Sequence, residues 1–74
     1  MKNQFNSLKF CTTLKVWRKM HNVSVTEMME LTTIARSTYN FIESGDRTPT
    51  MVEFTRLCQL IDFEASYFFD EVTK

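Results

Sequence analysis

Two copies of one short motif constrain the fold of this chain more than any other feature. Ser24 and Thr50 each stand three positions before a glutamate, Glu27 and Glu53 respectively. With this spacing the hydroxyl and the carboxylate accept backbone N–H groups that are unpaired at a helix N-terminus. Each motif therefore predicts the start of a helix. The single glycine, Gly45, lies between the two motifs and predicts a helix C-terminus.

Apolar periodicity predicts the other helices. Phe10, Leu14 and Trp17 recur on one helical face, and Asn22 suits the left-handed position after that helix. Alternating apolar runs that would predict strands are weak. We therefore expect a compact all-α fold of five helices. The helices are expected at about 7–21, 24–32, 36–44, from 50 onward, and 65–69. Met28, Leu31, Tyr39 and Ile42 are expected to face the core, and the methionines are expected to fill gaps in it.

Length and composition restrict the class of protein. The 74 residues are 43% hydrophobic and are expected to form one domain spanning 1–74. Cys11 and Cys58 stand far apart with a single histidine in the chain, so we expect buried thiols, no metal site and no cofactor. No apolar run approaches the roughly 18 residues that span a bilayer, and no nucleophile and base pair suggests an enzyme. We expect a cytoplasmic protein with no membrane partner and no small-molecule substrate.

The charge is balanced overall but unevenly distributed. Nine basic and nine acidic residues cancel, which argues against binding nucleic acid by bulk electrostatics. Residues 1–47 hold seven basic and four acidic residues, a net charge of +3, whereas 48–74 hold two basic and five acidic residues, a net charge of −3. A surface that faces DNA is therefore expected in the N-terminal part.

The segment 23–50, VSVTEMMELTTIARSTYNFIESGDRTPT, resembles the helix-turn-helix core of the Cro and phage-repressor group, the XRE family. The similarity covers roughly 10–69, with the motif core at about 24–45, and implies a lambda-repressor-like DNA-binding domain. The matching positions are Ser24, Glu27, Arg36, Ser37, Thr38, Ile42, Glu43, Gly45, Pro49 and Glu53.

Three departures from the family pattern affect the motif itself. Val25 replaces a glutamine that commonly touches phosphate in the family, so one DNA contact is expected to be missing. Met29 replaces a small alanine where the two helices approach each other. Thr33 replaces the turn glycine, which predicts backbone strain if its φ is positive.

The resemblance implies that the third helix enters the major groove while the second crosses the DNA backbone. Arg36 would bond to guanine, Asn40 to adenine, and Phe41 would touch a thymine methyl group. The alternative interpretation is that these are surface residues with no partner. The expected base contacts are Arg36, Ser37, Thr38, Asn40 and Phe41, and the expected phosphate contacts are Ser24, Arg47, Thr48, Lys15 and Lys19.

Two further sets of residues follow from the resemblance. Arg18 and Glu43 match a partly buried ion pair that joins the first helix to the recognition helix in phage repressors. The C-terminal aromatic residues exceed what the end of so small a core should use, so part of this cluster is assigned to a two-fold dimer interface. These residues are Phe63, Tyr67, Phe68 and Phe69.

The sequence thus favours a dimeric, nucleoid-associated transcriptional repressor or controller protein of phage or mobile-element type. Its partner would be double-stranded DNA with a palindromic operator. The alternative is a protein-interaction module that keeps the fold but has lost DNA binding, such as an anti-repressor or inhibitor. The zero net charge and Val25 favour this alternative, whereas Arg36, Arg47 and the basic N-terminal part favour the regulator.

Overall fold

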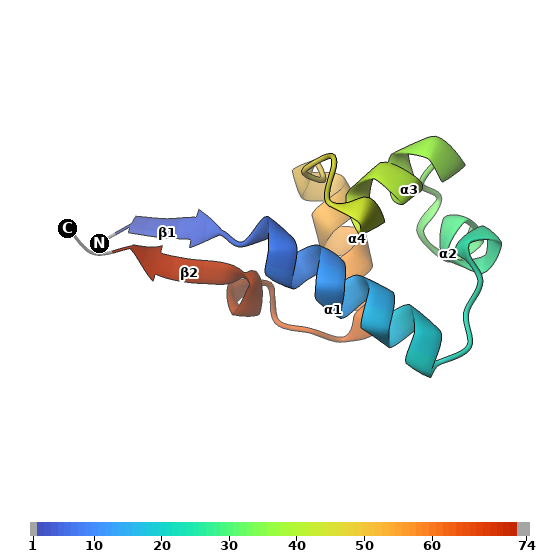
Figure 1. The fold of residues 1–74 in the computed structure, drawn as a ribbon, viewed down its shortest axis with the longest axis horizontal. Coiled ribbons are helices and arrows are strands. Elements are labelled where there is room, and N and C mark those ends of the chain that lie inside the picture. The colour runs from blue at the N-terminus through green and yellow to red at the C-terminus, as the bar shows by residue number, and fades with distance from the viewer. Residues whose placement is uncertain (1, 73–74) are drawn as a thin grey trace.

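The computed structural model describes residues 2–72, with side chains described for residues 4–70. Within that part the chain forms four α-helices, one 3-10 helix and two short strands (Figure 1). In chain order these are β1 (Lys2–Phe5), α1 (Ser7–Met20), α2 (Val25–Thr32), α3 (Arg36–Ser44), α4 (Met51–Ile61), η1 (Ala65–Phe68) and β2 (Phe69–Val72).

Both predicted capping motifs are confirmed. The Ser24 hydroxyl accepts the Glu27 N–H at 3.1 Å, and the Glu27 carboxylate accepts the Ser24 N–H at 2.9 Å. Thr50 and Glu53 make the same reciprocal pair at the start of α4. A side-chain cap typically contributes about 1 kcal/mol, so these two helices begin where the sequence specifies.

Among residues 2–72, four adopt the left-handed conformation at turns. Gly45 ends α3 with φ 86°, and Asn22 follows α1 with φ 59°, both as predicted. Thr33 ends α2 with φ 58° and Asp62 ends α4 with φ 61°, although neither is a residue type that favours this region as glycine does. Arg56 donates to the Thr33 hydroxyl at 2.8 Å, so α4 holds this turn in place.

The core lies between the four α-helices and η1. Both cysteines are buried and free, as expected. Leu31, however, is 60% exposed, because the buried stripe of α2 runs through Met28 and Thr32 instead. The expectation that the methionines fill the core is also wrong for Met20 and Met51, which are exposed. The buried core residues are Phe10, Cys11, Leu14, Met28, Ile34, Tyr39, Ile42, Phe54, Leu57, Cys58, Ile61 and Phe68.

The ends of the chain correct the all-α prediction. The short helix expected at 65–69 is a single 3-10 helix, and Phe69 already belongs to β2. β2 pairs with β1 in an antiparallel ribbon, with Phe5 opposite Phe69 and Lys2 opposite Val72. The rings of Phe5 and Phe69 have centroids 5.5 Å apart, and both pack against the core. This cross-strand pair holds the base of the ribbon on the helices, from which the ribbon projects (Figure 1).

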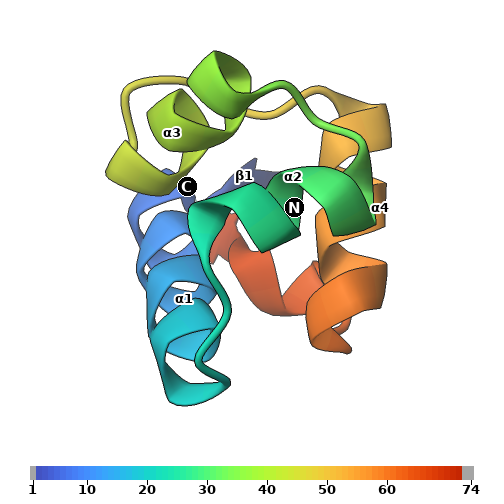
Figure 2. The ribbon, with the colours of Figure 1, turned by 90° about the vertical axis from the view of Figure 1, so that its right-hand side faces the viewer.

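The arrangement of the helices leaves α3 on the outside of the molecule. Seen from the side in Figure 2, α3 runs across the top, and α1 and α4 descend on either side with α2 between them. The C-terminal end of α1 lies at the opposite edge. This arrangement presents one face of α3 outward.

Among the described residues, no helix is long and apolar enough to cross a bilayer.

Candidate nucleic-acid interface

The outward face of α3 carries most of the side chains that were expected to contact bases. Arg36, Ser37 and Asn40 are exposed, and Phe41 is 50% exposed, whereas Thr38 is half-buried. The N-cap Ala35 makes no side-chain hydrogen bond to the first turn of α3, as its residue type predicts. This face has the composition of a recognition surface, with polar side chains and one aromatic ring.

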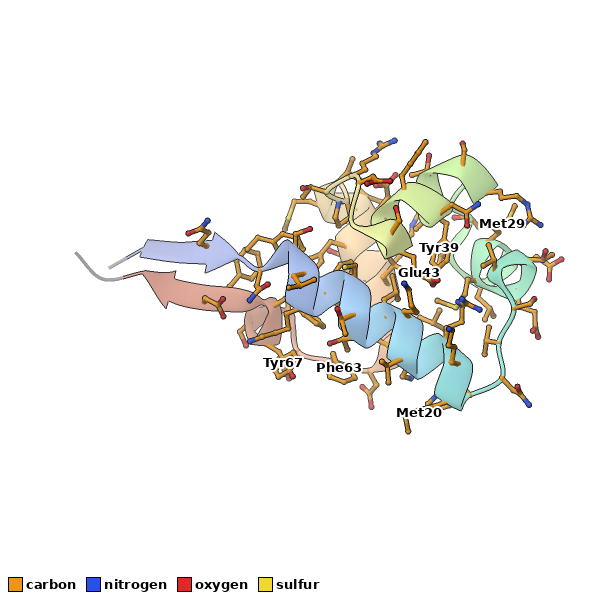
Figure 3. The ribbon with its side chains drawn as sticks, in the orientation of Figure 1. Met20, Met29, Tyr39, Glu43, Phe63 and Tyr67 are labelled. Atoms are coloured by element: carbon orange, nitrogen blue, oxygen red, sulfur yellow. The ribbon has the colours of Figure 1, made fainter. Side chains whose placement is uncertain are left out.

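The opposite side of α3 is fixed by a buried polar network. Two parallel hydrogen bonds join Arg18 to Glu43, from Nε to Oε2 at 2.8 Å and from Nη2 to Oε1 at 2.9 Å. Tyr39 is fully buried and donates its hydroxyl to the same carboxylate (Figure 3). Arg18 also donates to the Val23 carbonyl at 3.1 Å. The network joins α1 to α3 and to the loop before α2, which fixes the orientation of α3.

The electrostatics of this network favour its charged form. Burial raises the pKa of Glu43, but hydrogen bonds from Arg18 and Tyr39 outweigh burial and hold that pKa below its ordinary value. The hydrogen bond to Glu43 raises the pKa of Arg18. Burial, reinforced by the neighbouring carboxylate, raises the pKa of Tyr39 far above its ordinary range. Glu43 is thus ionised and Tyr39 neutral at neutral pH, which suits a structural unit rather than a proton-transfer site.

The helix α2 meets α3 at the first turn of each. The Arg36 guanidinium donates from Nη2 to the Thr26 hydroxyl at 2.6 Å, and both side chains are exposed. Val25, which replaces the family's glutamine, is half-buried and packs against the core. Met29 is half-buried as well. The hydrogen bond between α2 and the first residue of α3 is therefore made by Thr26 and not by Val25.

The residues expected to contact phosphate lie around α3 rather than in one cluster. Ser24 stands at the start of α2, where its hydroxyl already accepts the Glu27 N–H and keeps its own proton to donate. Arg47 and Thr48 are exposed in the loop after α3, where Arg47 Nη2 lies 4.0 Å from Glu53 Oε2. Lys15 and Lys19 are exposed on α1. The basic groups of this set thus come from the loop after α3 and from α1.

The C-terminal aromatic cluster is more buried than the sequence suggests. Phe68 is 0% exposed and belongs to the core, so its assignment to a dimer interface is wrong. Phe69 is half-buried, with its ring centroid 5.5 Å from that of Phe5. Phe68 packs against Phe10 in the first turn of α1, and both Phe68 and Phe69 pack against Phe54 of α4.

Phe63 and Tyr67 do reach the surface, and they line an apolar groove of about 380 Å³ against α1. Figure 3 places both rings and Met20 along the edge of the molecule opposite α3. The remaining lining residues are Thr12, Thr13, Val16, Trp17 and His21. This groove is separate from the face of α3 described above.

Three contacts at the site were not predicted from the sequence. Tyr39 was assigned to the core, but its spacing of four residues from Glu43 on one helical face could have indicated their contact. The Thr26–Arg36 contact joins α2 to α3, and the Arg56–Thr33 contact joins α4 to the turn after α2. No local sequence pattern indicates either contact. Such contacts depend on how the helices cross, which a single sequence does not display.

The geometry of α2 and α3 defines the class of protein. Two short helices joined by a tight turn, with the second presenting a polar face outward, form a helix-turn-helix unit. The family model described as helix-turn-helix matches residues 14–68. The chain belongs to this family of the XRE or Cro/C1 type, which consists of DNA-binding regulators. Comparison with curated proteins finds no match.

Proposed function

We propose that this protein is a sequence-specific transcriptional regulator that inserts α3 into the major groove of DNA. The observation that carries the proposal is the division of α3 into an anchored side and an exposed side. Tyr39 and Glu43 fix the helix to α1, whereas Arg36, Asn40 and Phe41 point to solvent. A rigidly held helix with free polar side chains is what base readout in the major groove requires.

The base contacts are assigned by chemistry. Arg36 has the fork of donors that matches guanine O6 and N7, and the Asn40 amide matches adenine N6 and N7. The half-exposed ring of Phe41 supplies an apolar surface for a thymine methyl group. Ser37 and the half-buried Thr38 complete the first turn and lie close enough to the N-terminus for contacts to bases or to the backbone.

The backbone contacts are assigned to groups on either side of α3. Ser24 would donate its hydroxyl proton to one phosphate, and Arg47 with Thr48 would bind another beyond the C-terminus of α3. Lys15 and Lys19 add positive charge from α1. Because the chain has zero net charge, specific affinity would depend on these few groups rather than on a general positive potential.

We further propose a homodimer, a repressor or controller protein of phage or mobile-element type that reads a palindromic operator in the cytoplasm. Half-sites on one duplex face lie about 34 Å apart, so both α3 helices must face the same way. Phe63 and Tyr67 lie opposite α3, and a two-fold contact there would turn the helices apart. The first turn of α4 lies at the same height as α3 in Figure 2. Met51 and Val52 are exposed in that turn and are better placed for a dimer contact.

Selection from a random duplex pool, followed by gel-shift measurements, tests the function directly. The protein should enrich one sequence, and Arg36→Ala should relax its preference at one base pair by about 1 to 3 kcal/mol. Arg47→Ala should weaken all sequences alike and reduce the salt slope by about one. A wild-type protein that enriches no sequence at low salt would refute the proposal.

A second candidate function is a protein-interaction module of the same fold, such as an anti-repressor. The apolar groove beside Val16, Met20 and Tyr67 favours it, because exposed apolar surface on a small domain marks a contact site. Under this proposal Met20→Glu would abolish regulation in cells while Arg36→Ala would not. The DNA-binding proposal expects the reverse.

A further inference from the structure

The side chains of Thr26 and Arg36 form a contact that the anchoring of α3 does not require. Arg36 Nη2 donates to Thr26 Oγ1 at 2.6 Å, and the two residues lie in the first turns of α2 and α3. Both side chains are exposed, so their removal would cost little stability. Arg36 takes part in none of the ion pairs found among residues 4–70.

The hydrogen-bonding capacity of each partner shows what the contact leaves available. A guanidinium carries five N–H donors in a fixed plane, and Thr26 accepts only one of them. The other donors remain free for a base edge. A free arginine side chain on a protein surface samples many rotamers, and this freedom is lost when it binds a base. A single strong hydrogen bond to a neighbouring helix removes part of that freedom in advance.

We propose that Thr26 is a positioning residue for base readout, which holds the Arg36 guanidinium in its binding orientation before DNA arrives. The inference rests on the proposed function, because it assigns Arg36 to a guanine. It adds a specificity-determining residue that does not itself touch the base. Loss of the Thr26 acceptor should lower the preference for the selected sequence about three- to tenfold, the range expected for ordering one long side chain.

Two substitutions isolate the hydroxyl. Thr26→Val keeps the shape of the side chain but removes the acceptor, whereas Thr26→Ser keeps the acceptor and removes only a methyl group. All variants should melt within a few degrees of the wild type, because position 26 is exposed. Preference is measured as the ratio of the dissociation constants for the selected sequence and for one changed at the guanine.

A double-mutant cycle separates positioning from direct contact. Thr26→Val should reduce the preference ratio in the wild-type background and have no effect in the Arg36→Ala background, because the group that it orients is then absent. Thr26→Ser should match the wild type. If Thr26 instead binds a phosphate, Thr26→Val will weaken both DNA sequences alike and will do so in both backgrounds, which would overturn the proposal.

Nitrogen-15 NMR of the arginine side chains tests the same contact without DNA. Rotation about the Arg36 Nε–Cζ bond should be slower in the wild type and in Thr26→Ser than in Thr26→Val. Arg47 in each variant serves as the internal reference, because it lies at the other end of α3. Equal rotation rates in wild type and Thr26→Val would refute the proposal even if DNA is bound specifically. A slow Arg36 in a protein that selects no sequence would refute the proposed function instead.

Discussion

The two sides of α3 differ in how much of their conformation the protein itself determines. On the inner side Tyr39 and Glu43 are buried, and their polar atoms are bonded to each other and to Arg18. On the outer side, Ser37, Asn40 and Phe41 are exposed. The periodicity of this nine-residue helix therefore places the residues that stabilise the fold on one side and the residues proposed to contact DNA on the other. Substitutions on the two sides should have separable effects.

The largest effect is expected at the centre of the inner side. Glu43→Ala leaves Arg18 partly buried with no carboxylate, and should lower the free energy of unfolding by about 3 kcal/mol. Chemical denaturation monitored by circular dichroism measures this loss. Glu30→Ala, on the exposed side of α2, is the matched control and should change stability by less than about 0.5 kcal/mol. Equal stability of the two variants would contradict the role assigned to the ion pair.

Acidification should lower the free energy of unfolding less than the Glu43→Ala substitution does. Because the pKa of Glu43 is lower in the folded protein than its ordinary value of 4.5, its contribution is complete above pH 4.5. This contribution to stability is lost as the pH falls through the lower pKa of Glu43 in the folded protein, because the carboxylate binds a proton more readily in the unfolded chain. The stability difference between wild type and Glu43→Gln should therefore shrink on acidification from pH 7. A constant difference down to pH 3 would show that Glu43 does not titrate as described.

Removal of one hydroxyl from the inner side should have a smaller effect. Tyr39→Phe keeps the ring in the core but removes one of the hydrogen bonds to Glu43, and should cost about 1 kcal/mol. The Arg18 bonds would still satisfy the carboxylate. Thermal melts measure the difference. A loss as large as that of Glu43→Ala would mean that the tyrosine, rather than the arginine, holds α3.

The outer side should give the smallest change in stability. Asn40→Ala should alter the free energy of unfolding by less than about 0.5 kcal/mol, because its side chain is exposed. It should nevertheless reduce discrimination at one base pair by about 1 to 3 kcal/mol. Measurement of both quantities on the same variant sharpens the comparison. A clear loss of stability without any change in DNA discrimination would show that the outer side is structural as well.

The features that the sequence predicts correctly are those decided within a few residues. The capping motifs at Ser24 and Thr50 and the stop at Gly45 each depend on hydrogen bonds or dihedral angles that are local. For the same reason the exposed side of α3 follows from its periodicity. The Arg18 and Glu43 contact came from a family resemblance, not from spacing, since 25 residues separate the two.

The features that the sequence does not predict depend on distant pairing. β1 and β2 are four-residue segments from opposite ends of the chain, too short to show a clear alternation. The sequence predicts Phe68 to be in excess of what the core needs, but η1 holds its ring in the core against Phe10, with ring centroids 4.9 Å apart. Thr26 and Arg36 meet only because of the angle between α2 and α3. Each of these outcomes is set by tertiary geometry.

The antiparallel ribbon has a practical consequence for engineering. Because Lys2 pairs with Val72, residues 2 and 72 lie at adjacent points, on the side remote from α3 (Figure 1). Neighbouring strands are separated by only about 4.8 Å, so a linker of a few residues would suffice to join them. A circularly permuted version, or one inserted into a surface loop of a host protein, should keep α3 unobstructed.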